Sequence, residues 1–503
     1  MKNFREDEMR LGLLALLLFC ACFQVKAAQG KDAPEADIRS NMGALEKLLA
    51  LDVQARAASL FAARGNLDLA KAERDAAVRA SGLFASEMRP YVRERLAKGA
   101  PDQRQFAASL LGDMGNTEDE TALRAAASPQ EASILVRDHA ISSLVKIYRR
   151  MSPAGRFARL EACLPHLDDE ASRDAACSIL ASFAPALEAF DFLPNQPQGK
   201  ATLDDQQARR IVRIIKEGQP RLRCFAAEAL AGIDTGIDLA MELMPLLVAE
   251  QSPEVRASLC HAIGGRVDGS AKMLSVAMGD ADPRVRIEAA GSQARLRSDP
   301  AAIDILCREA LEGEAPAGRR RALELLVFAA RPESALALVR LLDDESWALR
   351  ALTAKALGVM PGRSVTPKLG ALLNDSDPRV AYEAAIAMSR QGVAGVDTRI
   401  CEKLKQQAPA FCAYMAKALG EIGGKGVASD LAKLAAGSDA EAAAASVTAL
   451  GRIAWRVQGQ EAALALPNDF AAPLSIAIKD KRFCVSFAAA EALAQLTGLP
   501  FTT

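Results

Sequence analysis

Apolar residues recur through most of the chain with the spacing of one face of an α-helix. In one segment Val255, Leu259 and Ile263 lie four residues apart, which places them on a single helical stripe. Each stripe ends in an anchor residue, and the anchors from Leu326 to Leu450 follow one another every 31 residues. The anchors are Leu111, Leu144, Leu180, Leu230, Ile263, Gln293, Leu326, Leu357, Met388, Leu419, Leu450 and Leu493. A fixed period of this size predicts an all-α solenoid of about twelve helix-pair repeats.

The start of the first helix in each repeat carries a recognisable signal. Asp282-Pro283, Ser252-Pro253 and Asp377-Pro378 each precede an apolar stripe. Asp or Ser supplies an N-cap oxygen, and proline at the first helical position has no amide hydrogen to leave unpaired. A second helix is expected to follow, as over 335–342, 365–373 and 427–435. Each repeat is therefore predicted to be a helical hairpin.

These residues carry a family resemblance. The motif Asp-Pro-x-Val-Arg, followed by an alanine-rich helix that ends in Ala-Leu-Gly, resembles HEAT repeats of the short type named after phycobilisome lyases. The resemblance extends over residues 101–498 and is strongest over 223–451. It implies an α-solenoid and says little about function, because such repeats serve many roles. Bilin attachment by lyases of this type is cytoplasmic, so the resemblance implies no lyase activity for a chain with an export signal.

The first residues indicate export. An apolar run from Leu11 to Phe23 follows Arg10 and precedes Val25-Lys26-Ala27, which predicts a signal peptide over 1–27 with cleavage after Ala27. Two alternatives stay open, namely translation from Met9 and a lipoprotein anchored at Cys22. The remaining chain divides into a flexible leader (28–36), an N-terminal helical cap (37–100) and the HEAT-like solenoid (101–503). The expected location is periplasmic or extracellular.

Charge and cysteine content narrow the function classes. The 62 Lys and Arg residues nearly balance 63 Asp and Glu residues, so the chain has no general electrostatic attraction for nucleic acid, and none is expected as a partner. Eight cysteines follow the predicted signal peptide, and none forms a CxxC pair. Buried free thiols are expected, although export would permit disulfides.

An arginine recurs seven residues before the anchor in eight successive repeats. Seven residues are nearly two helical turns, so each arginine shares the stripe of its anchor. Its charge near a helix N-terminus opposes the helix dipole. We expect acidic or carbonyl partners in the adjoining turn or repeat, among Asp102, Asp168, Asp169, Asp280, Asp282, Asp343 and Asp344; an exposed anion-binding row is the alternative. The arginines are Arg104, Arg137, Arg173, Arg223, Arg256, Arg286, Arg319 and Arg350. Beyond Arg350 we expect less polar contact between repeats.

The sequence contains no catalytic signature. Its three histidines, His139, His166 and His261, have no metal-ligand spacing. No nucleotide-binding glycine motif or hydrolase elbow occurs, and 423–426 is interpreted as a turn between helices. We therefore expect no enzyme activity and assign no catalytic, cofactor-binding or metal-binding residue.

Two basic clusters and a tryptophan are the candidates for partner binding. They are Arg209, Arg210, Arg213 and Lys216 in one predicted helix, Arg319 and Arg320 at the start of another, and Trp347. The expected function is a monomeric, non-catalytic scaffold or adaptor that binds a protein partner in the bacterial cell envelope. Membrane attachment is expected only with lipidation at Cys22. The alternative is a cell-wall or carbohydrate-binding module that uses these basic and aromatic residues.

Overall fold

The computed structural model describes residues 57, 60–61, 71–82, 85–184, 201–264, 271–297, 299–329, 335, 338–360, 366–404, 408–461 and 468–497. The chain divides into two compact units, one formed by residues 89–369 and the other by residues 1–88 together with 370–503. The predicted signal peptide, the leader and Cys22 lie outside the described residues. In the part of the chain that is described, no helix has the length and apolar character of a transmembrane span.

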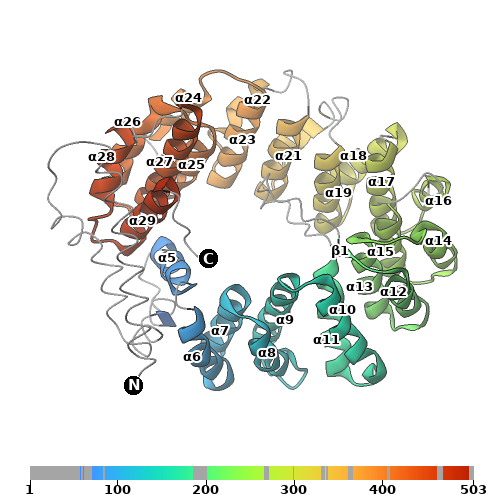
Figure 1. Ribbon diagram of the computed structural model, residues 1–503. Coiled ribbons are helices and arrows are strands. Elements are labelled where there is room, and N and C mark those ends of the chain that lie inside the picture. The colour runs from blue at the N-terminus through green and yellow to red at the C-terminus, as the bar shows by residue number, and fades with distance from the viewer. Residues whose placement is uncertain are drawn as a thin grey trace, which may run out of the picture. The chain divides into compact units, whose positions relative to one another are not determined.

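The unit of residues 89–369 consists of helices that pack in sequence order (Figure 1). Consecutive odd-numbered helices from α7 to α19 lie side by side, α21 follows, and even-numbered helices pack against them. The helices are α6 (Ala85–Lys98, shared with the other unit), α7 (Pro101–Met114), α8 (Glu120–Ala127), α9 (Ile134–Arg149), α10 (Pro153–Cys163), α11 (Glu170–Phe183), α12 (Asp205–Glu217), α13 (Pro220–Ala231), α14 (Leu239–Ala249), α15 (Pro253–Ile263), α16 (Ala271–Ala277), α17 (Pro283–Arg297), α18 (Pro300–Glu312), α19 (Pro316–Ala329) and α21 (Trp347–Val359), with 3-10 turns η1 (Thr117–Asp119), η2 (Leu164–His166) and η4 (Val339–Asp343). The predicted all-α solenoid is confirmed.

The second unit repeats this arrangement and adds a helix from the start of the chain. In it α23, α25, α27 and α29 pack in succession, and α5 packs against α27 and α29. Its elements are α5 (Lys71–Gly82), α22 (Thr366–Leu372), α23 (Pro378–Arg390), α24 (Val396–Leu404), α25 (Pro409–Ile422), η5 (Lys425–Val427), α26 (Ala428–Ala435), α27 (Ala440–Glu461), α28 (Asn468–Ala477) and α29 (Phe483–Thr497). The segment 423–426 therefore lies in the turn between α25 and α26, as expected.

The region predicted as an N-terminal cap contributes a helix to each of the two units. Val92 and Leu96 of α6 are buried, and Arg93 lies 3.3 Å from the fully buried carboxylate of Asp119 at the start of the first repeats. In contrast, α5 covers the last helices: Glu73 accepts a hydrogen bond from the Cys484 amide (3.0 Å), and Arg79 pairs with Glu491 (3.2 Å). Sequence patterns did not indicate this second contact, because it joins residues about 410 positions apart.

Helix starts follow the predicted rule with one exception. Asp377 caps α23 by accepting a hydrogen bond from the amide of Arg379 (2.9 Å), and Asp282 does the same for Arg284 in α17 (2.9 Å). Ser252 makes no such cap bond at α15; its hydroxyl donates instead to Glu254 (2.8 Å). In all three helices proline occupies the first turn. At α15, α17 and α23 the proline start is therefore kept even where the cap differs.

The anchors form the core between neighbouring repeats. All of them except Leu493 are buried, and Gln293 is buried to 4% exposure in the same place as the apolar anchors. A glycine after the anchor allows close helix approach: a Cβ at Gly264 would lie 1.9 Å from the Ser292 Oγ of the next odd-numbered helix. A two-residue parallel bridge between β1 (Ala201–Thr202) and β2 (Ile233–Asp234) is an addition that the sequence did not predict.

The cysteines of the repeats are free thiols, as expected. Cys163, Cys177, Cys260, Cys307, Cys401, Cys412 and Cys484 are buried, and Cys224 is half-buried. Burial raises the pKa of Cys177 to about 11 and that of Cys260 to about 12, which keeps both thiols protonated and unreactive at neutral pH.

Candidate functional site

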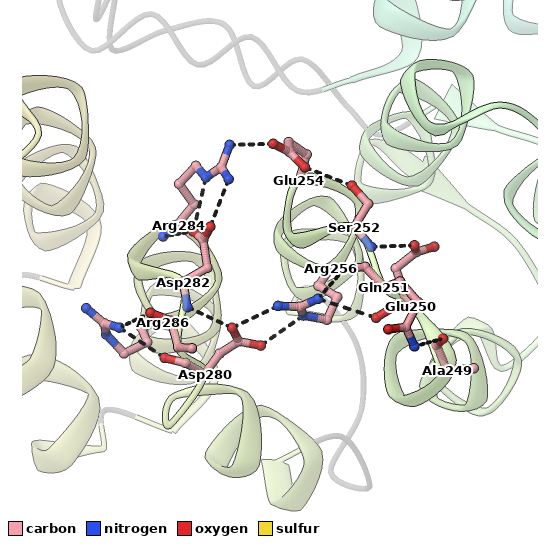
Figure 2. Close-up of polar contacts among 11 residues, drawn as sticks. Ala249, Glu250, Gln251, Ser252, Glu254, Arg256, Asp280, Asp282, Arg284 and Arg286 are labelled. Carbon is pink, nitrogen blue, oxygen red and sulfur yellow. Dashed lines mark hydrogen bonds and ion pairs between the residues drawn. The ribbon is translucent and has the colours of Figure 1, made fainter.

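The recurring arginines join one repeat to the next. Arg256 of α15 forms two hydrogen bonds of 2.9 Å with the carboxylate of Asp280, which precedes α17, and donates to the Gln251 carbonyl (2.9 Å) (Figure 2). Asp280 accepts two further hydrogen bonds. Its carboxylate accepts one from the Asp282 amide (2.9 Å), and its backbone carbonyl accepts one from the Arg286 guanidinium (3.0 Å). One loop acid thus binds the arginines of two consecutive repeats.

The same arrangement recurs along the unit. An arginine pairs with an acid that precedes the next odd-numbered helix in Arg104–Glu131, Arg223–Glu250, Arg256–Asp280 and Arg319–Asp344. Arg286 instead pairs with Glu309 of the second helix of its own repeat, α18. Arg173 and Arg350 bind loop carbonyls before their own helices. Among the described residues no side-chain partner is found for Arg137. The structural interpretation of the arginines is confirmed, and these side chains are committed to holding the repeats together rather than to binding an anion.

The partners were only partly predicted. Asp280 and Asp344 accept through their carboxylates and Asp168 through its carbonyl. Asp282 binds Arg284, Asp169 caps α11 and Asp343 binds Lys368 instead, whereas Glu131, Glu250 and Glu309 were missed. An acid two residues before the N-cap was the available signal, because Glu131, Glu250, Asp280 and Asp344 all occupy that position and accept the N-cap amide.

Polar contacts between repeats continue beyond Arg350 by other means. Arg482, at the start of α29, donates to the carbonyls of Gly437 (2.7 Å) and Asp439 (3.2 Å) in the preceding repeat. Arg456 of α27 donates to the Gly423 carbonyl (2.8 Å) at the end of α25. The expectation of fewer polar contacts in the last repeats was therefore wrong for these junctions, because arginines at other helix positions replace the missing series.

The structure disperses the predicted partner-binding residues. Arg209, Arg210, Arg213 and Lys216 lie on α12, where the last three pair with Glu161 (3.5 Å), Glu217 (3.0 Å) and Glu242 (3.7 Å). Arg319 belongs to the inter-repeat series, and the exposed Arg320 pairs with Glu324 (2.9 Å). Trp347, the first residue of α21, is half-buried. These residues do not form one surface, and most of their charge is already neutralised.

A cavity of about 580 Å³ lies on the odd-numbered helices of the same unit. It runs along α13, α15, α17 and α19 and reaches α9 and α11. Its lining has small side chains, such as Ala257, Ala317 and Gly318, and a set of charged ones that we call the charged row: Glu228, His261, Glu288 and Arg321. Each member of the charged row comes from a different, consecutive odd-numbered helix. The cavity is therefore a built feature of four stacked repeats.

Glu288 is the fixed centre of the charged row. Arg321 donates to both of its carboxylate oxygens (2.5 and 3.0 Å), and His261 Nδ1 lies 3.4 Å from Oε2. Burial alone would raise the pKa of Glu288, but the hydrogen bonds from His261 and Arg321 outweigh burial and hold the pKa at about 2. Glu288 is thus ionised throughout the neutral range.

Glu228 has a different environment. The Ser258 hydroxyl donates to its Oε1 (3.2 Å), and among the described residues no Lys or Arg nitrogen lies within ion-pair distance of its carboxylate. Burial raises the pKa of Glu228 despite the bond from Ser258. On the next helix His261 is only 6% exposed, and its buried Nε2 has no hydrogen-bond partner among the described residues. In the lining of the cavity, the buried His261 Nε2 and Arg149 Nε thus have no hydrogen-bond partner among the described residues, and Glu228 is held by Ser258 alone.

Sequence reasoning missed this site for an identifiable reason. Glu228 and His261 both stand two residues before their anchors, and Ser258, Glu288 and Arg321 stand five residues before theirs. Polar residues at these two positions in consecutive repeats would have marked a shared helix face. Among the described residues no cluster of His, Cys, Asp and Glu could hold a metal ion.

Known proteins resemble the chain in fold. The profile of HEAT repeats matches residues 239–327, 307–389 and 334–408, and no curated protein matches the sequence. Among solved structures, a mutant of Kap121p is 14% identical with a TM-score of 0.37, over 91% of this chain and 58% of the mutant chain. The Kap95:Nup1 complex gives 14% identity, a TM-score of 0.37 and coverages of 90% and 64%. An engineered protein is 17% identical with a TM-score of 0.28, over 79% of this chain and 98% of the engineered chain.

The family assignment follows from the repeat profile and the observed architecture. This chain spans little more than half the length of Kap121p, and at such identities the likeness concerns the fold alone. The matched segment, 239–408, contains helices α14 to α24, including the inter-repeat pair Arg256–Asp280 and most of the charged row. The profile therefore identifies HEAT repeats over residues 239–408, and the described helices pack as in a HEAT-type solenoid.

Proposed function

We propose that this protein is a non-catalytic scaffold of the bacterial cell envelope that binds a segment of a partner protein in the cavity along α13, α15, α17 and α19. HEAT-repeat solenoids are in general protein-binding scaffolds. The observation that carries the proposal is the cavity itself, about 580 Å³ in volume and lined by small side chains with unsatisfied polar groups. Binding sites commonly combine such a space with a few convergent polar groups.

The proposed location rests on the first residues. The apolar run from Leu11 to Phe23 and the Val25-Lys26-Ala27 pattern support export with cleavage after Ala27. Cell fractionation and N-terminal sequencing test this part. A mature protein in the envelope fraction that begins at Ala28 is expected; modification at Cys22 would make it a lipoprotein, and an uncleaved cytoplasmic protein would overturn the location.

The alternative is binding to the cell wall or to carbohydrate through the basic helix α12. Leu164, Pro165, Arg209, Arg210 and Arg213 line a second cavity of about 890 Å³. However, Arg210 and Arg213 already pair with Glu161 and Glu217, which reduces the positive charge that this surface offers to a ligand. We therefore favour a protein partner in the first cavity.

Site-specific photo-crosslinking in living cells tests the proposal. A benzophenone amino acid in place of Ala317, on the wall of the first cavity, is expected to capture one partner protein. The matched control is Val276 of α16, which is 68% exposed and does not line that cavity. A protein adduct from Val276 but not Ala317 would contradict the proposal. So would retention on isolated cell wall without any protein adduct from Ala317.

A further inference from the structure

We propose that the partner enters the cavity with a basic side chain, lysine or arginine, whose charged group binds between Glu228 and His261. This inference rests on the proposed function, because a partner segment must first occupy the cavity. It goes further by specifying the chemistry of the group that is recognised and the two residues that recognise it.

The carboxylate of Glu228 offers a place for a cation. It is held by one hydrogen bond, from Ser258, in a partly buried site. In contrast, the charge of Glu288, one helix beyond His261, is compensated by two hydrogen bonds from Arg321. A desolvated carboxylate without a counter-ion is unfavourable, and a bound ammonium or guanidinium removes that penalty. Because Glu228 has no ion-pair partner among the described residues, its carboxylate favours a positively charged ligand group.

His261 adds a second acceptor beside it. Its Nδ1 faces the ionised Glu288, 3.4 Å away, and lies at the same distance from Arg295. We place the ring proton on Nδ1, where it is donated to the acceptor-only Glu288 carboxylate; the Arg295 guanidinium, which only donates, then forms no hydrogen bond with Nδ1. The buried Nε2 is then an unpaired acceptor. Ser258 and His261 are three residues apart on α15, so they occupy one face of that helix. The carboxylate bound to Ser258 therefore lies close to His261.

An anionic ligand is less suited to this position. Arg284 is bound to Asp282 and Glu254, and Arg321 to Glu288 and Glu324. The remaining lining arginine, Arg149 at the end of α9, is two odd-numbered helices away from Glu228, a distance of about 16 to 20 Å at typical helix spacings. The small side chains of Ala257, Ala317 and Gly318 leave space for the aliphatic stem of a lysine or arginine.

Short fluorescent peptides test the inference directly. A heptaalanine peptide with lysine, arginine, norleucine or glutamate at its centre is titrated with the full-length protein, and binding is followed by fluorescence anisotropy. The lysine and arginine peptides are expected to bind at least about tenfold more tightly than the norleucine peptide, the scale expected for a hydrogen-bonded charge pair. Glu228→Gln, which is isosteric, should abolish that preference, and His261→Ala should reduce it. Glu217→Gln, on the exposed face of α12, is the matched control and should leave it unchanged.

The outcomes separate this inference from the proposed function. If all four peptides bind equally, or if Glu228→Gln retains the preference for lysine within about twofold, the recognition of a basic side chain by Glu228 is overturned. Peptide binding in the cavity would then still stand. A preference for the glutamate peptide, lost in Arg149→Ala, would reverse the charge of the recognised group. If no peptide binds, the inference is overturned, and the Ala317 crosslink decides separately whether the cavity is a binding site. Melting curves of each variant confirm that it is folded.

Discussion

Arg256 and Asp280 form two hydrogen bonds of equal length, 2.9 Å, across the boundary between consecutive repeats. Their side chains are 21% and 16% exposed. Asp280 also orders the turn before α17 by accepting the Asp282 amide, so one ion pair connects two repeats and fixes the start of a helix. A bidentate, partly buried pair of this type is stronger than an exposed surface pair.

Replacing either partner of this pair should lower stability. Arg256→Ala leaves the Asp280 carboxylate without its counter-ion, and we expect a loss of about 2 to 4 kcal/mol. The double variant Arg256→Ala/Asp280→Ala should show a coupling of about 1 to 2 kcal/mol in a urea-denaturation cycle. Arg213→Ala, which removes a pair whose two side chains are 75% and 62% exposed, is the control and should change stability by less than about 0.5 kcal/mol. An Arg256→Ala variant with an unchanged melting curve and lost ligand binding would contradict the structural role.

The charged row should make stability depend on pH in the acidic range. The folded-state pKa of Glu288 is lowered to about 2, so its stabilising contribution is complete above the unfolded-state pKa, near 4.3, and is lost as pH falls toward 2. The Tm difference between the wild type and Glu288→Gln should therefore be constant from about pH 6 to 7 and shrink below about pH 4.5. A difference that stays constant down to about pH 3 would show that the Glu288 charge does not stabilise the fold.

Because α15 and α17 approach closely at Gly264, alanine at this position should lower the stability of the fold. The new Cβ would lie 1.9 Å from the Ser292 Oγ and 2.8 Å from its Cα, so the helices must separate, at an expected loss of about 1 to 3 kcal/mol or more. Ser292→Gly in the same chain should recover part of the stability. At Gly424 an added Cβ meets nothing within 4 Å, and Gly424→Ala should leave the Tm nearly unchanged. Equal Tm values for the two alanine variants would rule out the close packing of α15 and α17.

The contact between α5 and α29 predicts a long-range effect of removing the start of the chain. Glu73 binds the Cys484 amide (3.0 Å), and Arg79 lies 5.5 Å from the centre of the Phe487 ring. In a variant that lacks residues 1–84, the amides of α29 should exchange hydrogen faster, because α29 loses the helix that packs against it. Helix α15, in the other unit, serves as the internal control. Unchanged exchange in α29 would mean that α5 does not stabilise the end of the solenoid.

The repeat interval and the helix starts could be predicted from the sequence alone. The 31-residue interval from Leu326 to Leu450 fixed the repeat, and the Pro-first helix starts at Pro253, Pro283 and Pro378 were confirmed. Helical periodicity reports which residues share a stripe, so the burial of the anchors and the inward position of the arginines could be predicted. The choice of Asp280 over Asp282 as the partner of Arg256 could not, because both acids lie within reach in sequence and only the turn geometry separates them.

Only the tertiary structure shows which charged and polar side chains have partners from other helices and which do not. The basic residues of α12 are prominent in the sequence, yet Glu161 and Glu242 from other helices pair with two of them. Glu228 and His261 are inconspicuous in the sequence. They become notable only when four helices stack, because Glu228 then has one hydrogen bond, from Ser258, and His261 Nε2 has none among the described residues. The sequence by itself therefore determined the repeat, the helix starts and the stripe of each arginine, since these depend on residues a few turns apart. The cavity and the α5–α29 contact depend on which distant charges meet, which only the packed repeats establish.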